Sequence, residues 1–185
     1  MAGSPSAKYL PFSHGLADPM SLRFARFSAE KVTERTPEQG LCISSFLIAR
    51  RDETVLLGKA LRPEMAREKW ILPASQLMYG EHPDEAARRI LKDQLKTEAE
   101  KLSNRGLWSF LGAHWDLCFV YDVVLRGEPK ASTEEDVKNY PEGYFYSSQL
   151  LGQLRYFKPE EIRRDQTGRG HDYVLEALGI LKAGP

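Results

Sequence analysis

The stretch from Trp70 to Thr97 constrains the fold of this 185-residue chain most strongly. A short apolar run ends at Pro73, and after a polar loop Pro83 precedes two acidic residues. Proline suits the first turn of a helix, and acidic side chains are favourable at its positive end. Apolar residues then recur at helical spacing, at Ala86, Ala87, Ile90, Leu91 and Leu95. This pattern predicts a loop followed by a helix with one buried face, from about residue 82 to 102.

This stretch resembles the Nudix box, the loop–helix motif G-x5-E-x7-R-E-U-x-E-E-x-G-U of the Nudix superfamily. The W-x-L-P sequence that precedes the motif in that family is present at Trp70, Leu72 and Pro73. Glu81 takes the first glutamate position, and Arg89 follows after the seven-residue spacer. The resemblance implies a structural ion pair between Glu81 and Arg89. It also implies an α/β/α sandwich around a mixed β-sheet, with the box helix and the C-terminal helix on opposite faces.

The metal-binding part of the motif is degenerate. The positions of the family's three metal-binding glutamates carry Ile90, Asp93 and Gln94, so one carboxylate remains. The motif's glycines are replaced as well, by Ala74, Ser75 and Lys96. On the helical wheel Gln94 falls within the apolar stripe, and we expect it at the rim of the buried face rather than in a pocket wall. The loop–helix scaffold is therefore predicted to be retained without its usual acidic site.

Helix geometry gives this loss a physical meaning. At about 100° per residue, positions 90, 93 and 94 share an arc of roughly 100°. Three carboxylates there would suit Mg²⁺, which neutralises a diphosphate and lowers the pKa of an attacking water. Each missing charge forfeits about 4 kcal/mol per unit of metal charge at 4 Å and an effective dielectric constant of about 20. A standard Mg²⁺ or Mn²⁺ site is therefore not expected.

Three functions remain open after this comparison. The first is a Nudix-like domain that binds a nucleotide or other phosphorylated ligand with little or no diphosphate hydrolysis. The second is an atypical metal-dependent hydrolase of nucleoside diphosphate derivatives, in which Asp93 holds Mg²⁺ or Mn²⁺ and Glu81 or Glu98 assists as ligand or base. The third is a non-catalytic interaction module, as a homo-oligomer or in a larger assembly. In this it would resemble the Nudix-fold subunit of the mitochondrial ribosome.

Two loops carry basic residues that could meet phosphates. Arg62, Arg67 and Lys69 lie in the polar segment before the box, and the plain alternative for them is a solvated loop. Arg169 and His171 accompany two glycines ahead of a last amphipathic helix predicted over 172–182. Flexible backbone at a helix N-terminus can receive an anion. The plain alternative is an ordinary loop-to-helix turn.

Composition limits the binding partners and the cellular compartment that we expect for the protein. Lys+Arg and Asp+Glu balance at 26 each, which argues against binding to nucleic acid by bulk charge. No apolar run approaches the ~20 residues that span a bilayer, and the first residues do not form a secretory signal. Cys42 and Cys118 lie in apolar strand-like runs, so we expect buried reduced thiols. Together these features predict a cytoplasmic protein without membrane attachment.

The remaining pattern predicts a flexible N-terminal arm over residues 1–20 and a single Nudix-like domain over 21–185. Alternating apolar residues predict a half-exposed strand at 21–29 and a hairpin from 41–50 and 54–59. The run 115–125 is apolar on both faces, which indicates a central strand covered on both sides. Further strands are predicted at 107–113, 144–147 and 154–157.

Overall fold

The computed structural model of the chain describes residues 41–61, 69–78, 80–111, 115–139, 150–168 and 170–182. The predicted arm and the strands expected at 21–29 and 144–147 lie outside these residues. In chain order the described elements are β1 (Leu41–Arg51), β2 (Thr54–Ala60), β3 (Trp70–Ile71), β4 (Ala74–Gln76), α2 (Pro83–Gln94), β5 (Ala99–Leu111), β6 (Trp115–Leu125), α3 (Glu134–Asn139), β7 (Leu151–Phe157), the 3₁₀ turns η2 (Pro159–Glu161) and η3 (Arg164–Gln166), and α4 (His171–Ala177).

The strands form one mixed seven-stranded sheet in the order β3-β2-β1-β6-β5, with β4 paired to β1 and β7 paired to β2. β1 and β6 run parallel, whereas the other pairs are antiparallel. The predicted hairpin is β1–β2, and Asp52 turns it with a positive φ of 52°. β6 lies between β1 and β5, which confirms the expectation of a central strand.

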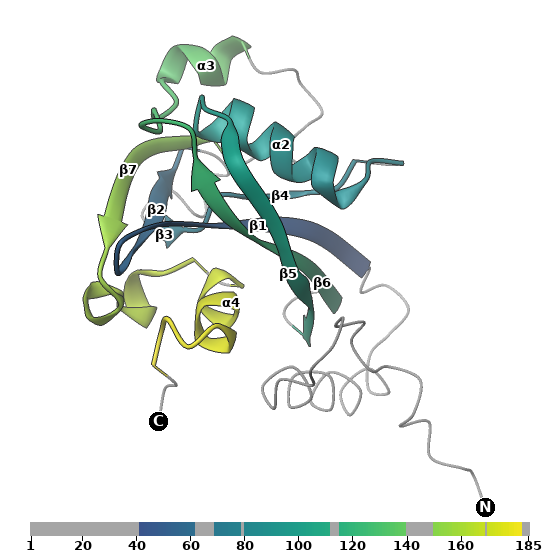
Figure 1. The fold of residues 1–185 in the computed structure, drawn as a ribbon, viewed down its shortest axis with the longest axis vertical. Helices are drawn as coiled ribbons and strands as arrows, with labels where there is room; N and C mark the ends of the chain where they lie inside the picture. Colours follow the sequence, from purple (N-terminus) through teal and green to yellow (C-terminus); the bar gives the residue numbers. More distant parts are fainter. Residues whose placement is uncertain are drawn as a thin grey trace, which may run out of the picture.

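Two helical layers cover the two faces of this sheet (Figure 1). Successive residues of β1 alternate between the two cores, as the two-residue period of a strand requires. Leu47 and Ala49 join the core beneath α2, while Phe46 and Ile48 join the core beneath α4. The predicted α/β/α arrangement is confirmed. Of the helices in the described part of the chain, none has the length and apolar character needed to cross a bilayer.

The box helix is shorter than the sequence pattern predicted. It ends at Gln94, because Lys96 adopts a left-handed backbone with φ of 51° and the Thr97 N–H donates to the carbonyl of Leu91 at 3.1 Å. β5 then begins at Ala99, where the pattern had been interpreted as helix. The strand expected over 107–113 is therefore the second half of a longer one.

The C-terminal segment holds the W-x-L-P stretch in place. The Gly168 N–H donates to the carbonyl of Trp70 at 2.9 Å, and the Leu72 N–H donates to Nδ1 of His171 at 3.1 Å. Gly168 comes so close to Ile71 that a Cβ would lie 2.4 Å from its Cγ2, so only glycine fits there. The segment leading into the box loop is thereby fixed from the α4 side of the sheet.

Candidate functional site

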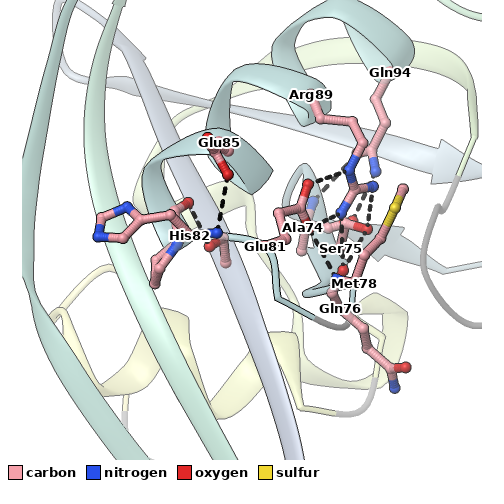
Figure 2. Close-up of polar contacts among 11 residues, drawn as sticks. Ala74, Ser75, Gln76, Met78, Glu81, His82, Glu85, Arg89 and Gln94 are labelled. Atoms are coloured by element: carbon pink, nitrogen blue, oxygen red, sulfur yellow. Dashed lines mark hydrogen bonds and ion pairs between the residues drawn. The ribbon is translucent and has the colours of Figure 1, made fainter.

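Arg89 is the centre of the loop–helix junction (Figure 2). Its guanidinium donates to both carboxylate oxygens of Glu81, from Nε at 2.7 Å and from Nη2 at 2.8 Å. It also donates to the Ser75 hydroxyl and to the carbonyl of Gln76, both at 2.9 Å. The Met78 N–H adds a further bond to Glu81 at 2.8 Å. The ion pair implied by the motif is thus present and ties the loop to α2.

This pair is largely shielded from solvent, with side-chain exposures of 15% for Arg89 and 12% for Glu81. The pKa of the Glu81 carboxyl is lowered, first by the hydrogen bonds from Arg89 and further by the Met78 N–H, although burial opposes the shift. Both carboxylate oxygens are already occupied as acceptors. Glu81 therefore serves as a structural anion and is poorly placed to act as a metal ligand or general base.

The N-terminus of α2 is fixed by a reciprocal cap. Nδ1 of His82 accepts from the Asp84 N–H at 3.3 Å, and Glu85 accepts from the His82 N–H at 3.1 Å. The hydroxyl of Tyr121 on β6 donates to Asp84 at 2.6 Å. Burial and the neighbouring carboxylate raise the pKa of Tyr121. These bonds position the helix on the sheet. The metal positions of the motif lie further along α2.

Two of the three metal positions face inward. Ile90 is 1% exposed within the core beneath α2. Gln94 is also 1% exposed, and its amide makes two bonds to the backbone of Ala74, donating to the carbonyl at 2.7 Å and accepting from the N–H at 3.2 Å. The rim position expected for Gln94 is therefore wrong. The helical wheel correctly directs the Gln94 side chain toward the apolar face. It could not predict full burial, because the backbone groups of β4 that hydrogen-bond to the amide are distant in sequence.

Asp93 retains the remaining carboxylate at a half-buried position. Its carbonyl accepts from the Ser132 hydroxyl at 3.4 Å. Glu98, an alternative acid, lies ahead of β5 and pairs with Arg126 at 2.7 Å. Within the described ranges, no three His, Cys, Asp or Glu side chains gather closely enough to hold a metal ion. The residues present thus do not fit the Mg²⁺ or Mn²⁺ site that the motif implies.

The predicted phosphate-binding residues are only partly visible. Arg62, Arg67 and Arg169 lie outside the described residues. Nζ of Lys69 donates to the carbonyl of Asp165 at 2.5 Å. His171 was expected to add positive charge, but it is 5% exposed and accepts a backbone hydrogen bond, and burial lowers its pKa to about 3. His171 is thus a neutral structural group and does not supply the positive charge expected of it at the start of α4.

A hollow of about 980 Å³ lies between the second half of α2 and the start of β5. We call it the α2–β5 hollow, because it is lined by residues of α2, the following turn and the start of β5: Arg88, Leu91, Lys92, Asp93, Lys96, Thr97, Glu98, Ala99, Glu100 and Leu102. The sequence interpretation missed it, since it placed residues 98–102 on the helix. The available signal was the motif's final glycine, which falls at Lys96, where the backbone has the positive φ of the turn that creates the hollow.

The mixed sheet between two helical layers, with a loop locked to a helix by a Glu–Arg pair, defines a Nudix-type sandwich. The NUDIX domain model matches residues 41–178. The chain therefore belongs to the Nudix family.

Solved structures agree with this assignment. The MutT NUDIX hydrolase from Burkholderia pseudomallei is 18% identical, with a TM-score of 0.58 over 75% of this chain and 98% of that one. The NUDIX hydrolase from Nitrosomonas europaea is 14% identical, with a TM-score of 0.55 over 75% and 86%. The E. coli ORF135 protein is 17% identical, with a TM-score of 0.54 over 80% and 96%. At these identities the likeness establishes the fold alone. No curated protein matches the chain.

Proposed function

We propose that this chain is a Nudix-fold protein that binds a nucleotide or other phosphorylated ligand with little or no diphosphate hydrolysis. The observation that carries the proposal is the state of Gln94. Its amide is buried and satisfied at both ends by the backbone of Ala74, where the family's motif has a metal-binding glutamate. A position closed in this way contributes no charge to a metal.

The neighbouring positions support the same conclusion. Ile90 belongs to the hydrophobic core, and the carboxylate of Glu81 is committed to Arg89. A single carboxylate, that of Asp93, is left on the arc. Asp93 alone would have to hold Mg²⁺ through waters and substrate phosphates, although Mg²⁺ demands near-ideal octahedral geometry. The Glu81–Arg89 pair still ties the loop to the helix, while the negative charge available to a metal on the arc is reduced to one carboxylate.

The test pairs binding with turnover. Titration calorimetry measures the affinity for ADP and ADP-ribose, and phosphate release from a panel of nucleoside diphosphate derivatives is measured with Mg²⁺ and with Mn²⁺. We expect binding of at least one panel member and release at the rate of the protein-free control. Asp93→Asn should leave that release unchanged.

Robust turnover that disappears in Asp93→Asn would refute the proposal. Asp122→Asn is the matched control, because Asp122 is a half-buried aspartate on β6 that pairs with Arg105 at 3.3 Å, away from the box loop. Absence of binding to every panel member would also count against it and would favour an interaction role.

A further inference from the structure

The α2–β5 hollow carries unneutralised charge on two walls. Arg88 and Lys92 are exposed on the α2 wall, about 6 Å apart along the helix axis. Glu100 is exposed on the β5 wall. Within the described part of the chain no ion pair neutralises any of these three side chains, whereas Lys96 pairs with Asp136 at 3.3 Å and Glu98 pairs with Arg126. Two cations and one carboxylate are therefore available to a ligand.

The floor between these walls is apolar. Leu91 is 2% exposed and belongs to the core beneath α2. Ala99 and Leu102 are half-buried and pack against the same core from β5. Small-molecule sites combine an apolar lining with a few placed polar groups, within volumes of roughly 300–1,000 Å³. The hollow, at about 980 Å³, has that character.

Ile90 and Gln94 do not line the hollow, whereas Asp93, the third position of the metal arc, does. At about 100° per residue, Arg88 and Lys92 lie on α2 roughly 160° away from Ile90 and Gln94. The positions of Arg88 and Lys92 are thus independent of the substitutions at Ile90 and Gln94. Occupation of the hollow requires neither Gln94 nor the loop to move.

We propose that the α2–β5 hollow is the nucleotide-binding site of this protein. The phosphates lie against Arg88 and Lys92, since charge-assisted hydrogen bonds from guanidinium and ammonium groups to phosphate are stronger than neutral hydrogen bonds. The base covers the apolar floor at Leu91 and Leu102, and its exocyclic amino group donates to Glu100. This inference rests on the proposed function, because it locates the ligand that the proposed function requires.

The experiment titrates ADP and inorganic pyrophosphate into the protein by calorimetry, without divalent metal. The double variant Arg88→Gln/Lys92→Gln should weaken both affinities by at least about tenfold, because two charged contacts are lost. The control Lys101→Gln/Lys182→Gln removes two exposed lysines that do not line the hollow and should leave both affinities unchanged. Unchanged thermal midpoints in both variants show that they remain folded.

Glu100→Gln separates nucleotide recognition from simple attraction of anions. This variant should weaken the affinity for ADP without weakening the affinity for pyrophosphate, which has no amino group to donate to the carboxylate. If Arg88→Gln/Lys92→Gln binds ADP as well as the control does, the hollow is not the site, while the proposed function still stands. If Glu100→Gln affects neither ligand, the nucleotide assignment is overturned. If the wild type binds no phosphorylated ligand, the proposed function fails as well.

Discussion

Replacing Gln94 by glutamate would return a carboxylate to a metal position of the motif, yet we predict that it destabilises the protein. In the wild type the amide both donates to and accepts from the backbone of Ala74. An ionised carboxylate can still accept from the N–H, but it cannot donate to the carbonyl at 2.7 Å. The substitution therefore leaves a buried carbonyl facing a negative oxygen.

The magnitude follows from these two bonds. A buried acceptor that loses its donor costs about 1–3 kcal/mol, and more where charge is involved, so we expect a loss of about 3 kcal/mol in the free energy of unfolding at neutral pH. Burial raises the pKa of the introduced carboxyl group above the ordinary glutamate value of about 4.3. The penalty is thus present above that raised pKa and is lost as the pH falls through it, because the protonated acid can donate to Ala74.

Urea denaturation of Gln94→Glu and wild type, with chelator at neutral pH and at about pH 4, measures this effect. Gln153→Glu is the control, since Gln153 is exposed on β7. This substitution should change the free energy of unfolding by no more than about 0.5 kcal/mol. If the urea midpoint of Gln94→Glu at neutral pH equals that of the wild type, the reasoning is refuted. Full recovery on adding Mg²⁺ would also contradict it, since Asp93 and the new carboxylate would then have assembled a metal site.

Two further predictions concern stability. The folded protein keeps His171 neutral down to a pKa of about 3, while the unfolded chain binds a proton near 6.5, so stability should fall as the pH drops from 6.5 toward 3. His171→Asn keeps an acceptor for Leu72 and should flatten this dependence in urea midpoints; an unchanged slope would contradict the assignment. Lys96→Gly should be more stable than Lys96→Ala by about 1 kcal/mol, because both lose the pair with Asp136 but only glycine relieves the φ of 51°. Equal thermal midpoints for these two variants would show that the left-handed backbone is not strained.

The sequence predicted the architecture well where a local pattern determined it. The two-residue alternation in 41–59 and the apolar run 115–125 defined three strands, and the spacing of Glu81 and Arg89 defined the loop–helix junction. Each of these features depends on neighbours within one element or across one turn. They could therefore be recognised before any tertiary contact was known.

The end of α2 and the hollow beside it could not be recognised in this way. Apolar spacing continues through Leu95 and Leu102, so a helix to 102 fitted the pattern. The turn at Lys96 depends on a backbone conformation that lysine seldom adopts. Once that turn is made, Glu98 and Glu100 face the flank of α2 across the hollow rather than continuing its surface.

The burial of Gln94 shows a different limit. Periodicity placed the side chain toward the apolar face, but a buried amide is stable only when its hydrogen bonds are satisfied. The partners are the N–H and C=O of Ala74, twenty residues earlier and in another element. Sequence spacing contains no information about that match.

The attachment of the W-x-L-P stretch to the C-terminal segment has a consequence for synthesis on the ribosome. Leu72 and His171 are 99 positions apart, and Trp70 bonds to Gly168 over a similar separation. A nascent chain can form α2 and the β1–β2 hairpin early, but β3 gains these contacts only when the segment around Gly168 has emerged. Attachment of the W-x-L-P stretch is thus postponed until His171 has left the ribosome, and a chain stopped before Gly168 would lack these two contacts.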